Sequence, residues 1–155
     1  MRGIQYLILL SILPIGGFSE DRSKIPGNTY SLSELHGLKP NDLAEYFPNI
    51  PDVSAGDFVE LTDTNGWSAI QFSFNGNCRL AGIIFSCEGG LSEPAALTKL
   101  VDLGVKVPNE AFRNQFLISW KNLSGKIRTI NFHLTEDSRH LVYEIGIFFD
   151  IDWNE

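Results

Sequence analysis

The sequence is poor in the residue types that carry most protein chemistry. It has two cysteines, three histidines and one methionine among 155 residues, and 12 lysines and arginines against 19 aspartates and glutamates. The net charge of −7 disfavours nucleic acids and anionic membrane surfaces as partners, because a basic patch must neutralise such polyanions. The sequence also lacks a G-x-S-x-G nucleophile elbow and a glycine-rich phosphate loop. No motif therefore names a reaction or a cofactor.

Long apolar runs are also missing. The longest candidate, residues 4–15, follows Arg2 and contains a proline, and it falls short of the roughly 20 residues that span a bilayer. This layout is typical of a secretory signal peptide at residues 1–19, cleaved after Ser19, with an uncleaved membrane anchor as the alternative. We expect a soluble domain over residues 20–155, periplasmic or secreted. Losing one of the 12 cations leaves it with a charge of 11 − 19 = −8.

The two cysteines, Cys78 and Cys87, fall on what reads as one strand. Cysteines in an oxidising compartment usually pair. An extended span between them covers about 30 Å, however, whereas a disulfide needs Cα atoms within roughly 7 Å. Geometry favours free thiols, and a sharp bend near Gly82 that lets the bridge form is the alternative. Within an apolar strand the pKa of Cys87 is expected to rise, which argues against a nucleophile.

The clearest element is a β-hairpin over residues 67–87. Ile70, Phe72 and Phe74 recur with the period of two that a half-buried strand requires. Asn75-Gly76 then supplies residues that tolerate positive φ in a tight turn. A preceding strand near residues 58–62 completes three antiparallel strands.

This pattern returns later in the chain. The segment GIIF at residues 82–85 recurs as GIFF at 146–149, and residues 127–134 repeat the alternation of the first hairpin arm. We interpret these likenesses as two halves, residues 31–88 and 92–150, each a helical part followed by three strands. The alternative is that any two alternating strands look alike.

The predicted fold class is α+β. Helices are expected near residues 31–36, 40–47 and 92–103, where capping residues precede apolar stripes. The simplest packing is a mainly antiparallel sheet of about six strands with the helices across one face. The opposite face would then be a mixed polar and aromatic surface, formed by Trp67, Gln71, Ser73, Thr129, Asn131 and His133.

Groups that could act in catalysis or bind metal are scattered. His36, His133 and His140 stand in no recognisable catalytic setting, and solvated or structural roles are favoured for them. Asp150, Asp152 and Glu155 lie near the C-terminus without a glycine-containing calcium loop or a nearby histidine, so we interpret them as a solvated acidic end. The sequence predicts no enzyme, no metal and no cofactor.

Exposed aromatic residues are the better lead, because tryptophan and tyrosine are enriched where proteins bind other proteins. Trp67, Trp120, Trp153 and Tyr143 are candidates, and the alternative is that they cover the core and the sheet edges. Combining this lead with the open face and the acidic end gives the predicted partner-binding residues: Trp67, Gln71, Asn131, His133, Asp150, Asp152 and Trp153.

A small, acidic, exported α+β protein without catalytic groups resembles bacterial periplasmic immunity proteins and other inhibitors, a resemblance of class that transfers no residues. The leading prediction is a non-enzymatic protein-binding module, such as an immunity protein or inhibitor, whose partner is a basic toxin or enzyme. One rival is a binder of small ligands or envelope components, which needs a concave apolar pocket between sheet and helices. Another is a hydrolase with an unrecognised site.

Overall fold

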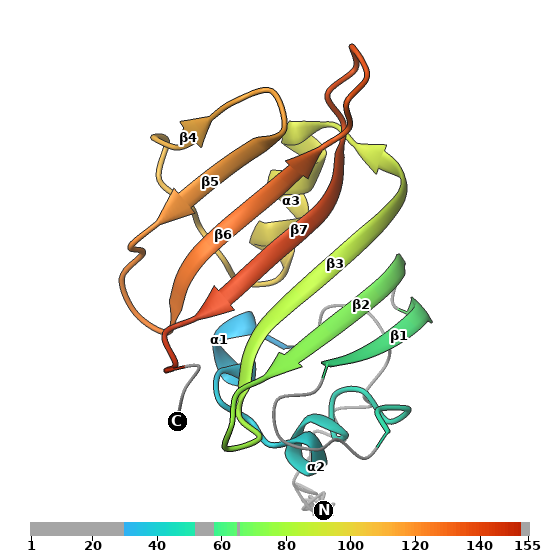
Figure 1. Cartoon of the computed structure of the whole chain (residues 1–155), viewed down its shortest axis with the longest axis vertical. Helices are drawn as coiled ribbons and strands as arrows, with labels where there is room; N and C mark the ends of the chain where they lie inside the picture. Colours follow the sequence, from blue (N-terminus) through green and yellow to red (C-terminus); the bar gives the residue numbers. More distant parts are fainter. Residues whose placement is uncertain (1–29, 52–57, 65, 153–155) are drawn as a thin grey trace, which may run out of the picture.

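The computed structural model describes residues 30–51, 58–64 and 66–152, and the predicted signal peptide lies outside them. These residues form a mainly β structure around one seven-stranded antiparallel sheet with strand order β1-β2-β3-β7-β6-β5-β4 (Figure 1). The strands are β1 (Phe58–Thr64), β2 (Trp67–Phe74), β3 (Leu80–Leu91), β4 (Phe112–Arg113), β5 (Leu117–Lys121), β6 (Ile127–Leu134) and β7 (Val142–Phe149). The predicted antiparallel sheet is confirmed, and the added strand is the two-residue β4 within a predicted connection.

The helices are short: α1 (Leu32–Leu35), α2 (Pro40–Leu43) and α3 (Glu93–Asp102). Ser92 caps α3 by accepting a hydrogen bond from the backbone N–H of Ala95 at 3.4 Å, and Gly104, at φ 78°, follows the end of the helix. The sequence predicted all three helices, but α1 and α2 have four residues each. The expected layer of helices across one face is therefore replaced by a mainly β architecture.

The two sets of strands meet at the pairing of β3 with β7 in the middle of the sheet. Ile83 of β3 lies opposite Ile147 of β7, so the two copies of the Gly-Ile-[Ile/Phe]-Phe segment run past each other in antiparallel register. On either side the order continues outward as consecutive strands, β2 and β1 on one side and β6 and β5 on the other. The internal repeat itself stays a prediction.

The core lies on the sheet face that carries the alternating large apolar residues. Ile70, Phe72, Phe132 and Ile145 have no exposed surface, as the period of two predicted for the strands. Leucines of all three helices join the same buried cluster, namely Leu32, Leu35, Leu43 and Leu100. In Figure 1, α3 lies behind β6 and β7, which identifies the far side of these strands as the core face.

Two local predictions about glycine and asparagine were wrong. The loop between β2 and β3 takes its positive φ at Cys78, whereas buried Asn75 acts through its side chain, which accepts backbone hydrogen bonds from Asn77 and Arg79. Likewise β3 does not stop before residues 89–90. Both glycines there adopt φ 74° within an irregularity of the pairing, and the ladder resumes at Leu91 opposite Val142.

Candidate functional site

The face opposite the core, here called the open face, holds every second residue of the strands. One row of directly paired positions crosses it from strand to strand and consists of Glu60, Gln71, Ile84, Gly146, Asn131 and Ser119. No described helix lies in front of β6 or β7 in Figure 1. Ile84 and Phe148 are part-exposed on this face. Apolar side chains thus reach the surface at the middle of the sheet.

Phe148 lies over two glycines at the centre of the open face. A Cβ built on Gly82 would be 3.1 Å from Cδ1 of Phe148, and one built on Gly146 would be 3.2 Å from Cε2. These glycines stand on the two neighbouring strands, β3 and β7, and a side chain at either position would meet the ring. Because both positions lack a side chain, the Phe148 ring can lie directly against the backbone of β3 and β7.

Polar groups flank this centre and bind one another across the strands. The Gln71 amide nitrogen donates to Oε2 of Glu60 at 2.6 Å, on the β1 side. The Ser119 hydroxyl lies 2.7 Å from Oδ1 of Asn131 and donates to it, on the β5 side. The predicted placement of Gln71 and Asn131 on the open face is confirmed, and each side chain is held by a strand farther from the centre.

His133 also lies on the open face, as predicted. Its ring centroid is 6.3 Å from that of Tyr143 on β7, with the rings inclined at 62° in an edge-to-face arrangement. Tyr143 is 39% exposed. The pair therefore adds a second aromatic surface to the open face, on β6 and on β7, the strand that also carries Phe148. The pairing of β6 with β7 shifts next to this pair: His133 lies opposite Glu144 and Leu134 opposite Val142, so Tyr143 is an extra residue of β7 without a partner position.

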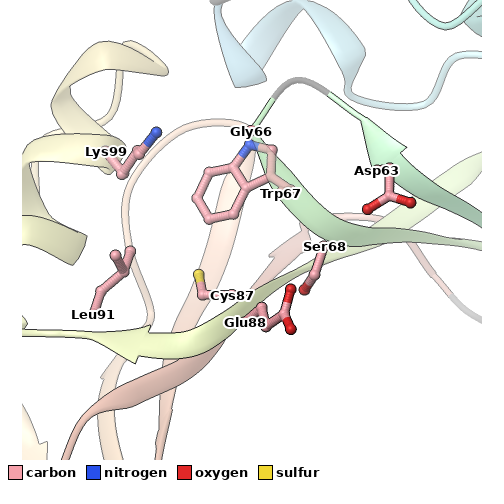
Figure 2. Close-up of a pocket in the computed structure, with 8 residues that line it drawn as sticks. All are labelled: Asp63, Gly66, Trp67, Ser68, Cys87, Glu88, Leu91 and Lys99. Carbon is pink, nitrogen blue, oxygen red and sulfur yellow. The ribbon is translucent and has the colours of Figure 1, made fainter.

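Trp67 is a correction to the predicted site. Its side chain is only 4% exposed, and its ring centroid lies 4.8 Å from that of buried Phe85. Figure 2 shows the indole between Lys99 of α3 and Cys87 of β3, and the Lys99 ammonium nitrogen is 5.3 Å from the ring centroid. Strand alternation is lost between Trp67 and Ile70, where Ser68 and Ala69 are both part-exposed and the pairing of β2 with β3 begins only at Ala69.

The cavity beside Trp67 has a volume of about 360 Å³ and mixed chemistry. The carboxylates of Asp63 and Glu88 lie on its far side from Lys99 in Figure 2. Burial raises the pKa of the Cys87 thiol to about 11, and the nearby Lys99 charge opposes this only in part. The expected rise of this pKa is confirmed, and both cysteines are free. A protonated thiol is a poor nucleophile, so the cavity does not favour thiol catalysis.

The acidic end lies apart from the open face. Asp150 and Asp152 line a separate cavity of about 660 Å³ together with His36 and Arg79. Asp150 is exposed and its carboxylate is 3.9 Å from Arg128, while the backbone carbonyl of Asp152 accepts a hydrogen bond from buried Asn75. The remaining predicted residue, Trp153, lies outside the described residues. The structure therefore places Gln71, Asn131 and His133 on the open face, whereas Trp67 and the two aspartates lie elsewhere.

The histidines do not converge. The His36 ring packs edge-on against Phe149 and its Nε2 lies 3.3 Å from the carbonyl oxygen of Asp150, whereas His133 faces Tyr143 and His140 is exposed in a turn. In residues 30–51, 58–64 and 66–152 no three His, Cys, Asp or Glu side chains come close enough to hold a metal ion. No helix of this part of the chain is both long and apolar enough to cross a membrane.

Phe148 is the site residue that the sequence interpretation missed. The signal was present, because Gly82 and Gly146 alternate with the core positions of their strands and glycine inside a strand often marks a close approach. The sequence alone does not show that β3 pairs with β7, and this pairing is what places Gly82 opposite Phe148. Trp120, a predicted exposed aromatic, is instead buried at 3% exposure and donates its indole N–H to the Pro108 carbonyl.

Comparison with known proteins adds no relative: no family model, no curated protein and no solved structure matches the chain.

Proposed function

We propose that the chain is an exported, non-enzymatic module that binds another protein through the open face of its sheet. The observation that carries this proposal is Phe148 on Gly82 and Gly146 at the centre of that face. An aromatic ring held against backbone loses little conformational freedom on binding, which suits it to be an anchor. Gln71, hydrogen-bonded to Glu60, and Asn131, held by the buried Ser119 hydroxyl, supply polar groups around it.

The proposed partner is a basic protein, such as a toxin or an enzyme that the module neutralises by covering its active surface. The support is electrostatic, since the chain carries −7, or −8 without residues 1–19. Opposite net charges steer association and raise the on-rate, and salt screens this effect. Raising the salt concentration should therefore lower kon more than it raises koff.

The test begins with affinity capture from the exported fraction of the source organism, followed by titration of the captured protein. Phe148→Ala should weaken binding by about 2 kcal/mol, roughly thirtyfold in Kd, if the ring is an anchor. Phe116→Ala is the control, because Phe116 is also a surface phenylalanine, 47% exposed, but is out of phase with the open face, two residues before buried Ile118. Equal affinity of both variants would refute this face as the binding surface.

A further inference from the structure

A third cavity lies on the core side of the sheet, between α3, the segment after it and β5. It has a volume of about 510 Å³, within the range of small-molecule sites. Its walls are mainly branched aliphatic side chains and one indole, contributed by Leu97, Val101, Val105, Val107, Pro108 and Trp120. Val101 is 57% exposed although it is apolar. The cavity and the open face are on opposite sides of the sheet, so this inference does not depend on the proposed function.

The walls of the cavity are fixed in place by hydrogen bonds. The Trp120 indole N–H donates to the Pro108 carbonyl at 2.9 Å, which ties the segment after α3 to β5. The backbone N–H of Val105 donates to the Leu100 carbonyl at 2.8 Å, which holds the start of that segment against the helix end. A site that exists before its ligand arrives costs little to organise on binding.

The mouth of the cavity carries more positive than negative charge. Glu93 and Arg113 form a two-pronged ion pair with N–O distances of 2.7 and 2.8 Å, and Lys106 adds a further cation. Hydrogen bonding from Arg113 lowers the pKa of Glu93, so that carboxylate stays ionised near neutral pH. The lining residues thus sum to one positive charge, in a protein whose net charge is −7.

We infer that this cavity binds a small carboxylate with an apolar body, such as a short acyl or phenylalkyl acid. The apolar body would lie against Val101, Val105 and Trp120, where its burial removes hydrocarbon surface from water. The carboxylate would stay at the mouth beside Lys106, where it is partly solvated and neutralises the surplus charge. A cationic ligand would meet this surplus positive charge and is disfavoured.

The probe for this inference is 3-phenylpropionate, with the uncharged 3-phenylpropanol as its counterpart. The readout is the indole N–H signal of Trp120 in a proton–nitrogen NMR spectrum, assigned with Trp120→Phe. We expect 3-phenylpropionate to shift this signal saturably with one-site stoichiometry. The alcohol should bind about two- to fivefold more weakly, the range for a solvent-exposed charge interaction.

Two variants locate the ligand. Val101→Glu places a carboxylate at the apolar mouth and should weaken binding of the acid about tenfold or more, while the exposed position preserves folding. Lys106→Gln should weaken the acid two- to fivefold and leave the alcohol unchanged, whereas Lys39→Gln, at the distant cavity beside His36, should change neither. The inference is overturned by an unsaturable shift, by equal binding to wild type and Val101→Glu, or by shifts centred on Phe148 instead of Trp120.

Discussion

At the scale of single residues, Cys87 shows how burial can outweigh a nearby charge in setting a pKa. Its thiol sits in β3 beside the Trp67 indole, and desolvation raises its pKa from 9.0 to about 11. Below pH 9 the folded and unfolded chains both keep this proton. Between pH 9 and 11 the unfolded chain loses it while the folded chain keeps it, so stability falls as pH rises through this window.

We therefore predict that alkylation of Cys87 by iodoacetamide follows an alkaline pH profile. In Cys78→Ser, where Cys87 is the single cysteine left of two, the midpoint should lie near pH 11 in the folded protein and near 9 in urea. Mass spectrometry of the alkylated protein gives the rates, and Cys87→Ser reports Cys78 under the same conditions. A folded-state midpoint near 9 would show that the thiol is solvated.

Residue burial was predictable within strands and not at their ends. Phe72 and Phe132 are buried as alternation required, because each has paired neighbours on both sides along its strand. Trp67 follows the turn directly, and near it Asp63 and Gly66 adopt φ of 49° and 77°. The pairing of β2 with β3 begins only at Ala69, so the period of two that holds from Ile70 to Phe74 does not extend back to Trp67.

At the scale of elements, the bulge in β3 depends on two glycines with equal backbone geometry and unequal surroundings. Gly89 and Gly90 both have φ 74°. A Cβ on Gly89 would meet nothing within 4 Å, whereas a Cβ on Gly90 would lie 2.7 Å from the Cβ of Leu141. The first position thus carries only the cost of a left-handed conformation, and the second adds a steric clash.

We predict that Gly89→Ala lowers the free energy of unfolding by about 1–2 kcal/mol, the cost of placing a non-glycine residue at positive φ. Gly90→Ala should cost clearly more, because Leu141 must move as well. Urea unfolding followed by circular dichroism measures both, and each variant is the control for the other. Equal destabilisation would mean that Leu141 yields without cost.

The helices and strands themselves were largely predictable from the sequence, whereas the pairing of distant strands was not. Hydrophobic alternation predicted the six longer strands, and the capping serine with its following proline predicted α3. The two-residue β4 offers too short a pattern to recognise, since Phe112 and Arg113 are both exposed. The open face was predicted, but its centre at Phe148 depends on which strands meet, and no local pattern encodes that pairing.

At the scale of the whole molecule, the central ladder and the shared core join both sets of strands. Phe72 packs edge-on against Phe47 at 4.8 Å between ring centroids, and Phe132 packs in the same way against Trp120 at 5.1 Å. Phe72 lies in β2 and Phe132 in β6, on either flank of the central β3–β7 pair, and both belong to one continuous buried cluster on the core face. Neither set of strands can therefore lose its packing without exposing apolar surface of the other set.

We predict that Phe72→Ala and Phe132→Ala each lower the free energy of unfolding by about 3–5 kcal/mol, because each removes a fully buried ring. Both should shift one common transition, since a shared core unfolds as one unit. Chemical denaturation followed by far-ultraviolet circular dichroism and by tryptophan fluorescence should give coincident curves. Phe116→Ala, at a half-exposed position, is the control and should change stability by about 0.5 kcal/mol or less. Separate transitions by the two probes would show that the two sets of strands fold independently despite the β3–β7 pairing, and a loss under about 1 kcal/mol at either ring would show that its side chain is not packed as in this core.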